Sequence, residues 1–316
     1  MDWTLAAAAL GIGIIVGLTG MGGGALMTPV LVLFFNVTPL AAVSSDLVSA
    51  AVMKPVGGFV HLRKGTVRLD LVKWLCIGSI PSAFCGVLIA RALGDSDTVD
   101  AAIKKALGVA LILAASGLFF RAYLRLAERA RRGDASRDPD PTGPPANITI
   151  RRVPTIIVGI VGGVVVGMTS VGSGSLMIVA LMLLYPTLRA SELVGTDLVQ
   201  AVPLVMSAAI GHIFFGDLQL DVTGALLVGS IPGAYIGAQL SSRLPGALIR
   251  RALAFVLLAS SLKLFGVDTT LTLIVLGALA LVAGPIWMVL RRAHGFPALP
   301  KHERQAEADE SVAADA

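Results

Sequence analysis

Residues 17–27 read GLTGMGGGALM, and residues 167–177 read GMTSVGSGSLM. Each stretch interrupts a long apolar run near its middle, and Gly, Thr, Gly, Gly, Leu and Met return in the same order. Glycine permits a break in a helix, because it reaches positive φ without a Cβ clash and lets other backbone approach closely. The two stretches therefore predict two broken helices of the same kind.

The similarity between the two halves extends beyond the glycine stretches. The main matches, at a displacement of 150–151 residues, are Ser45-Asp46-Leu47-Val48 with Thr196-Asp197-Leu198-Val199, Gly78-Ser79-Ile80-Pro81 with Gly229-Ser230-Ile231-Pro232, and His61 with His212. In apolar sequence, matches of Leu, Val and Ala are common by chance, whereas matches of Asp, His and Pro are not. The chain is therefore an internal duplication.

The composition is that of a membrane protein. Of the 316 residues, 55% are hydrophobic and 14% are charged, whereas a soluble domain carries about 25% charged residues. Uncharged segments such as 222–240 and 271–290 are long enough to cross a bilayer as helices. We expect an all-α polytopic membrane protein. The N-terminal segment carries an acidic residue and no basic region, so we expect no cleaved signal peptide.

Each half reads as one glycine-broken hairpin followed by three transmembrane helices. The expected boundaries are 1–127 for the first membrane repeat, 128–152 for a linker, 153–265 for the second repeat, 271–290 for an additional helix and 291–316 for a tail. Uninterrupted helices are expected over 41–62, 70–92, 100–124, 190–214, 220–242 and 248–265. The linker is charged, rich in Pro and Gly and without periodicity, which is typical of disordered segments. We place the linker and the tail in the cytoplasm.

The distribution of Lys and Arg predicts how the two repeats face. If each broken run crossed the membrane once, the repeats would be parallel, and the arginine-rich loop 243–251 would lie outside. That arrangement violates the tendency of Lys and Arg to stay on the cytoplasmic side. If each broken run instead enters and returns on one side, most Lys and Arg become cytoplasmic. We therefore expect inverted repeats in the cell (inner) membrane, with the N-terminus outside and the C-terminus inside.

A half-helix begins after each break, near Ala25 and near Ser175, with unpaired N–H groups and the positive end of its dipole exposed. Small residues in apolar helices also serve close packing, but these stretches are duplicated and carry hydroxyl groups. Two such N-termini that meet at the midplane form an anion pocket. The residues expected to bind the substrate are Thr19, Gly20, Gly22, Gly23, Gly24, Lys54, Thr169, Ser170, Gly172, Ser173 and Gly174.

Two aspartates and one lysine are expected at membrane depth, where ionisable groups are costly and usually face a cavity or a partner. Lys54 has no counterpart in the second half. It adds positive charge to the pocket, neutralises Asp46 or snorkels towards the interface. Asp46 and Asp197 each follow a hydroxyl residue, Ser45 or Thr196. These positions are either helix N-caps or proton carriers that couple transport.

The sequence offers no support for catalysis or for a cofactor. It contains no Ser-His-Asp set, no metal-ligand spacing and no paired carboxylates, and the glycine stretches lack P-loop or dinucleotide spacing. Cys76 and Cys85 are interpreted as small buried residues, and His61 and His212 as interfacial anchors or loop caps. The net charge of +5 arises at the ends of apolar runs. We expect neither an enzyme nor a nucleic-acid-binding protein.

At these residues the chain resembles the sulfite exporter TauE/SafE-like family, also called the toluenesulfonate uptake permease family. The segments that carry the resemblance are GLTGMGGGALMTPVL (17–31), SSDLVSAAVMKPVGGFVHLRKGTVRLD (44–70), GSIPSAFCGVLIA (78–90), GMTSVGSGSLM (167–177), VGTDLVQA (194–201), GHIFFGDL (211–218) and GSIPGAYIGAQL (229–240). The resemblance implies an inner-membrane permease for sulfur-containing anions, such as sulfite or organosulfonates, that works by a secondary, ion-coupled route. Many members carry a plain hydroxyl residue at the positions of Asp46 and Asp197, so the aspartates mark a subfamily.

We therefore expect a permease for a small anion, in which movement of one repeat against the other gives alternating access. Its partners are the anionic substrate and the lipid bilayer, and the sequence leaves open a coupling proton or cation and a homodimer. One alternative is a cation carrier or proton-coupled metal carrier with Asp46 and Asp197 as ligands. Another is a non-transporting membrane scaffold whose basic linker recruits a cytoplasmic partner.

Overall fold

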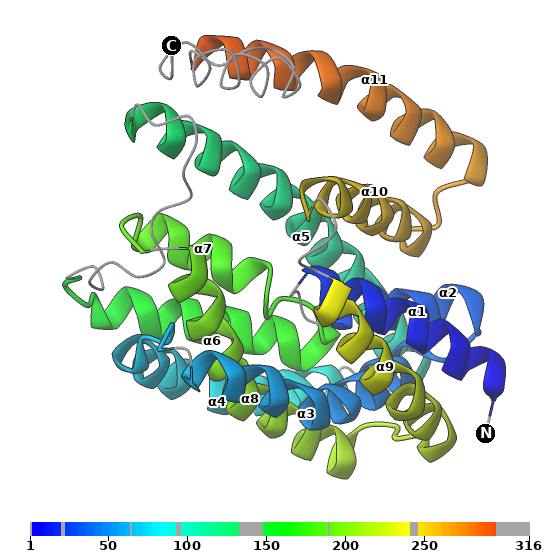
Figure 1. Ribbon diagram of the computed structural model, residues 1–316. Helices are drawn as coiled ribbons and strands as arrows, with labels where there is room; N and C mark the ends of the chain where they lie inside the picture. Colours follow the sequence, from blue (N-terminus) through cyan, green and yellow to red (C-terminus); the bar gives the residue numbers. More distant parts are fainter. Residues whose placement is uncertain are drawn as a thin grey trace, which may run out of the picture.

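The apolar runs form helices in the computed structural model, which describes residues 2–19, 23–63, 65–92, 96–132, 148–188, 190–240 and 246–294. Within these residues the chain forms eleven helices and no β-strand. The first half contains α1 (Trp3–Thr19), α2 (Gly24–Phe34), α3 (Pro39–Arg63), α4 (Leu69–Ala92) and α5 (Ser96–Arg132). The second half contains α6 (Arg152–Thr169), α7 (Leu176–Leu184), α8 (Ala190–Phe215), α9 (Leu220–Leu240) and α10 (Gly246–Leu264), followed by α11 (Thr269–Ala293) (Figure 1).

The order of the helices agrees with the sequence prediction. Each glycine stretch divides an apolar run into two helices, α1 and α2 in the first half and α6 and α7 in the second. The uninterrupted helices that were predicted in each half are present as α3, α4 and α5 and as α8, α9 and α10. The additional helix is α11. The all-α fold of a polytopic membrane protein is thereby confirmed.

The segment predicted as a linker, 128–152, is helical at both of its ends. α5 continues to Arg132 and α6 begins at Arg152, while residues 133–147 lie outside the described part of the chain. The extension of α5 has a local cause. Residues 123–132 are rich in Leu, Ala, Glu and Arg, which favour helix wherever packing does not decide the conformation.

Glycines bring the first helix of each half against a helix of the other half. α1 packs parallel to α9, and α6 packs parallel to α4. The facing pairs are Gly229 with Ala6 and Gly237 with Ile14 in the first contact, and Gly78 with Ile156 and Gly86 with Val164 in the second. A Cβ atom at any of these glycines would collide with the partner backbone. Close packing of small residues therefore interlocks the two halves.

Helices that correspond in the two halves run antiparallel to each other. The start of α3 meets the end of α8, where Ser44 contacts His212. The end of α3 meets the start of α8, where Gly58 faces Val199. α5 and α10 are likewise antiparallel. Antiparallel counterparts are the relation that inverted repeats require.

The two helices of each broken run form a hairpin. α8 runs antiparallel to α3, and α9 reverses direction after α8, so α9 runs in the same direction as α3. α1 is parallel to α9 and therefore also runs in the same direction as α3. The intervening α2 must therefore run back towards the side from which α1 came. Thr28 of α2 accordingly lies beside Asp46, near the start of α3. The first break thus reverses the direction of the chain. That the breaks lie within the membrane, as the distribution of Lys and Arg predicts, stays a prediction.

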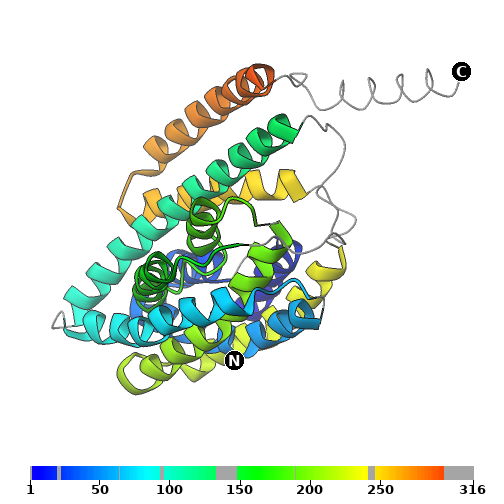
Figure 2. The same cartoon turned by 90° about the vertical axis from the view of Figure 1, so that its left-hand side faces the viewer.

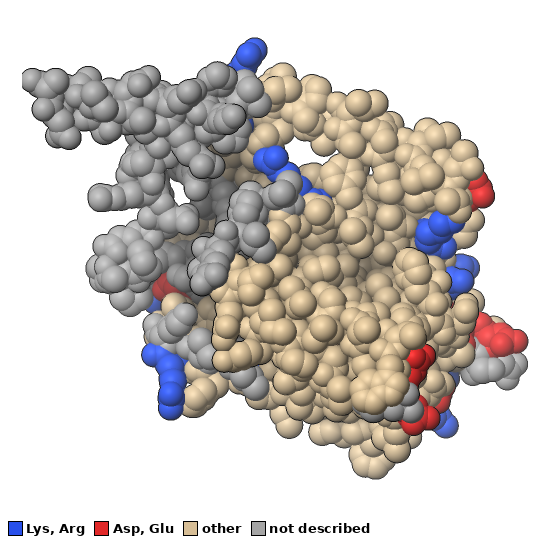
Figure 3. Space-filling model, turned by 45° about the vertical axis from the view of Figure 1, so that its right-hand side comes forward, with Lys and Arg blue, Asp and Glu red and all other residues tan. Residues whose placement is uncertain are grey.

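The outer surface of the bundle suits a lipid environment. Six of the described helices are long and apolar enough to cross a membrane, and α1 and α2 are shorter apolar helices. The face shown in Figure 3 carries few charged side chains, most of them towards its margins. α11 has the highest mean hydropathy of the six, 2.5, and lies beside α10 at the edge of the bundle (Figures 1 and 2). Which end of the bundle faces the cytoplasm stays a prediction.

The expectation that both cysteines are buried was wrong. Cys76 is partly buried and Cys85 is exposed. The cause is the position of α4 at the surface of the bundle. Ile77 and Ile89, which lie on the same side of this helix as Cys85, are also exposed. Apolar character alone does not separate a lipid-facing position from a buried one in a membrane helix.

Buried polar side chains gather on α3 and α8, the corresponding helices that pack against each other. They are Ser44, Ser45, Asp46 and Ser49 on α3, and Glu192, Thr196, Asp197, Gln200 and His212 on α8. Polar groups away from water are unfavourable unless they are hydrogen-bonded or paired. Their concentration on one pair of helices therefore marks the place where a polar solute can be accommodated.

Candidate functional site

The break of the second repeat lies against the start of the first half-helix. Gly24, the first residue of α2, faces the backbone and hydroxyl of Ser170, and a Cβ atom at Gly24 would lie 2.7 Å from the Ser170 Oγ atom and closer still to the backbone. Only a residue without a side chain allows this approach. The structure therefore joins residues from both glycine stretches at one point, as the duplication predicts.

The second break is a stretch of left-handed backbone between α6 and α7. Ser170 has a φ of 58°, Gly172 of 133° and Gly174 of 96°. Glycine is required at the last two positions because other residues rarely adopt such φ angles. α7 starts at Leu176, whose N–H donates to the Gly172 carbonyl at 3.0 Å. The predicted half-helix start near Ser175 is therefore correct to within one residue.

The two threonines of the glycine stretches use their hydroxyl hydrogens locally. Thr19 Oγ1 donates to the Ile15 carbonyl at 2.8 Å, and Thr169 Oγ1 donates to the Val165 carbonyl at 2.6 Å. A hydroxyl has a single hydrogen to donate. Thr19 and Thr169 therefore close the ends of α1 and α6 and offer no hydrogen to an anion in this conformation.

The remaining glycines of the first stretch have separate positions. Gly23 lies one residue before α2, and its carbonyl accepts the N–H groups of Leu26 and Met27 at 3.0 and 2.9 Å. It therefore serves as the first acceptor of the half-helix. Gly20 and Gly22 lie outside the described residues.

Asp46 connects α3 to both repeats. Its carboxylate is 3% exposed and accepts the Ser170 hydroxyl at 2.5 Å and the Thr28 hydroxyl at 3.2 Å. Asp46 lies about two turns inside α3, which begins at Pro39, so it does not cap this helix. Asp197 likewise lies inside α8 and is 2% exposed. Of the two interpretations of the aspartates, N-capping of α3 and α8 is therefore excluded.

Lys54 reaches the second break from α3. Its ammonium group donates a hydrogen bond to Ser173 Oγ, and it interacts electrostatically with the carboxylates of Asp197 and Asp46. The lysine thus interacts with both aspartates and lies beside the hydroxyl-bearing loop. Of the predicted substrate-binding residues, Lys54, Ser170 and Ser173 come together with Gly24 around this loop.

Several polar groups of α2, α3 and α8 were missed by sequence reasoning. Ser49, Gln200 and Thr28 are all buried, and Gln200 Nε2 donates to Ser79 Oγ at 2.8 Å. The Oγ atoms of Ser45 and Ser49 and the Oε1 atom of Gln200 have no hydrogen-bond partner among the described residues. Buried polar atoms are normally hydrogen-bonded, so these groups keep capacity for a polar solute or water.

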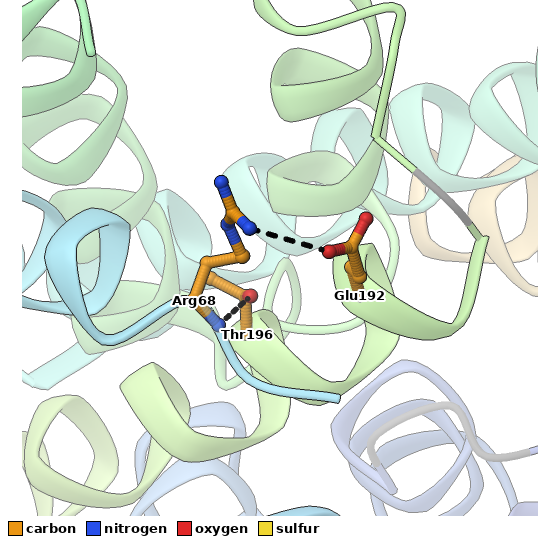
Figure 4. Close-up of polar contacts among 3 residues, drawn as sticks. All are labelled: Arg68, Glu192 and Thr196. Atoms are coloured by element: carbon orange, nitrogen blue, oxygen red, sulfur yellow. Dashed lines mark hydrogen bonds and ion pairs between the residues drawn. The ribbon is translucent and has the colours of Figure 1, made fainter. Parts of the chain in front are cut away.

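A hydrogen-bonded contact joins the two repeats at the end of the bundle where α3 finishes and α8 starts. We call it the Arg68 clasp. The Arg68 N–H donates to Thr196 Oγ1 at 3.0 Å, and the Arg68 guanidinium lies 3.6 Å from the Glu192 carboxylate (Figure 4). Thr196 therefore binds the loop before α4 instead of capping its own helix. His61 holds the same loop through Thr66, with Nδ1 and Oγ1 2.9 Å apart, in agreement with a loop-capping role.

The corresponding contact at the opposite end is the Ser44 clasp. The Asp217 N–H donates to Ser44 Oγ at 3.3 Å, and Ser44 Oγ lies 2.8 Å from His212 Nδ1. The other ring nitrogen, Nε2, donates to the Gly167 carbonyl at 2.8 Å. His212 is fully buried, so the prediction of an interfacial anchor was wrong for this residue. Its ring ties the start of the second glycine stretch to α3.

These features define a class of protein: a helical membrane protein in which two duplicated halves, with antiparallel counterpart helices, surround a polar centre built at broken helices. This is the architecture of secondary transporters. The chain belongs to the sulfite exporter TauE/SafE family, whose model matches residues 5–264. The match ends at the last residue of α10, so α11 lies beyond the family core.

The curated relatives are named as transporters. The chain is 39% identical over 254 residues to "Probable membrane transporter protein YjnA" of Bacillus subtilis (strain 168), an alignment that covers 80% of this chain and 95% of YjnA. It is 25% identical over 242 residues to "Probable membrane transporter protein YdhB" of the same organism, covering 77% of this chain and 91% of YdhB. No solved structure matches the chain at a significant level. The protein is a multi-pass membrane transporter of the TauE/SafE type.

Proposed function

We propose that this transporter moves a small sulfur-containing anion, such as sulfite or a sulfonate, across the cell membrane. The observation that carries the proposal is the hydrogen bond from Lys54 to Ser173, which brings a cation from the first repeat to the break of the second. The N-terminus of α7 begins directly after this loop and adds the positive end of a helix dipole. The family is named for sulfite export, which agrees with this chemistry.

The two clasps support transport by alternating access. In the Arg68 clasp, the loop after α3 of the first repeat binds α8 of the second repeat. In the Ser44 clasp, the loop after α8 binds α3. They lie at opposite ends of the antiparallel pair, and both are formed in this structure. Release of one clasp at a time opens the polar centre to one side of the membrane only. This is the movement that inverted-repeat transporters use.

A cation carrier is the second candidate, because the carboxylates of Asp46 and Asp197 both interact electrostatically with Lys54. The hydrogen bonds of Asp46 oppose this candidate. Ser170 and Thr28 donate hydrogens to the carboxylate, whereas a metal ion is bound by oxygen lone pairs that point towards it. A site in which the hydroxyl groups of Ser170 and Thr28 act as hydrogen-bond donors suits an anion better than a metal ion.

The proposal is tested by ligand-induced thermal stabilisation of the purified protein at constant ionic strength. Thiosulfate, sulfate, an aryl sulfonate, sodium and zinc are compared. A ligand at 100 times its Kd stabilises the folded state by about 2.7 kcal/mol. We expect stabilisation by a sulfur oxyanion that is lost in Lys54→Gln and kept in Lys105→Gln, whose lysine is exposed on α5. Stabilisation by a cation alone, lost in Asp46→Asn, would contradict the proposal.

A further inference from the structure

The Asp46 carboxylate holds hydroxyl groups that an anionic substrate also requires. Ser170 and Thr28 come from the break of the second repeat and from the half-helix of the first, and both donate to Asp46 Oδ2. A carboxylate and a sulfur oxyanion make the same kind of contact, since each accepts hydrogen bonds through negatively charged oxygens. An ionised Asp46 therefore occupies, from within the protein, part of the site that the proposed function assigns to the substrate.

The charges around Asp46 make simultaneous occupancy unfavourable. Lys54 on the same helix is positive, and Asp197 on α8 is negative. His212 on α8 contacts Ser44, which lies two residues before Asp46 on α3. Asp100 on α5 lies beside the first turn of α3, where it accepts the Leu40 N–H. α2 and the loop before α7 contribute hydroxyls without charge. Asp46, Lys54 and Asp197 together carry a charge of −1 when both aspartates are ionised. An incoming anion adds at least one more negative charge at membrane depth.

We propose that Asp46 is a built-in competitor of the substrate and that a proton on Asp46 releases Ser170 and Thr28 to the anion. The proton comes from water on the side to which the site is open, and it returns to water on the other side when the anion leaves. Each anion therefore crosses together with one proton. This inference rests on the proposed function, since it assigns the coupling ion of the same site.

The first test counts protons in the wild-type protein. Calorimetric titration with thiosulfate, whose charge is constant between about pH 5.5 and 7.5, is performed in two buffers with different enthalpies of ionisation. We expect uptake of about one proton per anion, and an affinity that falls up to about tenfold per pH unit as Asp46 becomes ionised. The sign follows because the protonated form binds the anion. Binding of thiosulfate without proton uptake would overturn the inference and leave the anion permease standing.

The second test assigns the proton to a residue. Asp46→Asn keeps the shape of the side chain and cannot ionise, so we expect it to bind thiosulfate without proton uptake and with an affinity independent of pH. Asp221→Asn, a matched change at an exposed position of α9, should behave as the wild type. Loss of proton uptake in Asp197→Asn or His212→Gln, with uptake retained in Asp46→Asn, would overturn the assignment.

The two proposals fail in different ways. Absence of binding by every sulfur oxyanion at every pH would remove the anion permease and this inference with it. If Asp46→Asn does not fold, Ser170→Ala takes its place. This variant removes the 2.5 Å hydrogen bond to the ionised carboxylate, so we expect proton uptake to begin at higher pH than in the wild type. An unchanged pH dependence in Ser170→Ala would count against competition for the hydroxyl.

Discussion

At the scale of single residues, the site depends on how closely Gly24 approaches Ser170. The first half-helix starts where the second glycine stretch turns, and the absence of a side chain at Gly24 leaves room for the Ser170 carbonyl and hydroxyl. The hydroxyl of Ser170 is thereby held beside Asp46. The conformational role of glycine at 172 and 174 is different, because there φ is positive. The two glycine stretches thus contain glycines of two kinds: Gly24 allows a close approach, and Gly172 and Gly174 allow positive φ.

We predict that Gly24→Ala destabilises the protein by about 1–3 kcal/mol, as overpacking of a well-packed site does. Its added methyl group would overlap the Ser170 backbone. The loss is measured as a lower melting temperature in detergent, together with weaker anion-induced stabilisation. Gly11→Ala is the control, since nothing lies within 4 Å of a Cβ atom there. Equal melting temperatures for both variants would show that the approach of Gly24 to Ser170 is not tight in solution.

A second prediction concerns the buried imidazole of His212. His212→Ala leaves the Gly167 carbonyl without its donor and the Ser44 hydroxyl without the ring. Unsatisfied buried polar groups cost about 1–3 kcal/mol, so the melting temperature should fall clearly. His61→Ala is the matched control, because His61 is only partly buried and its described contact is with Thr66 in the next loop. A larger effect of His61→Ala than of His212→Ala would contradict this account.

Sequence reasoning identified the residues of the site better than their partners. The duplication singled out Asp46, which matches Asp197, because polar matches in apolar sequence are informative. Ser170 and Ser173 were singled out by their hydroxyls within the second glycine stretch. The duplication could not find Thr28, whose counterpart in the second half is the apolar Ile178. It also could not distinguish N-capping from interior positions for the aspartates, since that depends on where each helix begins. Ser49 and Gln200 carried a usable signal, one turn after Ser45 and Thr196.

At the scale of helices, the antiparallel pair α3 and α8 carries both clasps. Helix existence and order followed from the apolar runs, and the breaks followed from glycine, so the elements were predicted almost completely. The packing partners were not. The packing of α1 on α9 and of α6 on α4 depends on small residues distributed along both helices of each pair. This pattern cannot be recognised in one sequence before the contacts between the helices are known.

We predict that Glu192→Gln loosens the Arg68 clasp. The ion pair is partly buried, with side-chain exposures of 23% for Arg68 and 8% for Glu192. Its loss costs about 0.5–1 kcal/mol, so the population of molecules in which this clasp is open should rise about two- to fivefold. A cysteine placed at Gln200, with Cys76 and Cys85 replaced by Ser, should react faster with a charged thiol reagent from the cytoplasmic side. Ser44→Ala should instead raise its reactivity from the opposite side. A reversed pattern would invert the predicted membrane orientation.

At the scale of the whole molecule, α11 is separable from the transporter core. The 18-residue window of α11 that is most apolar contains no buried residue, and the family match ends before the helix. Its contacts with the core include the stacking of the Arg251 guanidinium over the Trp287 ring at 5.3 Å. A helix with so little buried surface contributes little to the stability of the bundle.

We therefore predict that a chain ending at residue 268 folds, with a melting temperature close to that of the full chain, and keeps the stabilisation by sulfur oxyanions. A chain ending at residue 245 is the comparison, since it also lacks α10 with the buried side chains of Leu253 and Leu257. That chain should not yield a folded protein. Loss of anion binding in the longer truncation product would show that α11 belongs to the working unit.

The interlocked packing of α1 and α9 sets a constraint on biosynthesis. α9 begins at Leu220, about 200 residues after α1 ends at Thr19, so the glycine-facing side of α1 leaves the ribosome long before its partner exists. Contacts so distant along the chain form late. Until the second half has been translated, α1 must be covered by lipid or by the insertion machinery. A ribosome that stalls in the linker leaves a first half that lacks α9, the helix against which α1 packs.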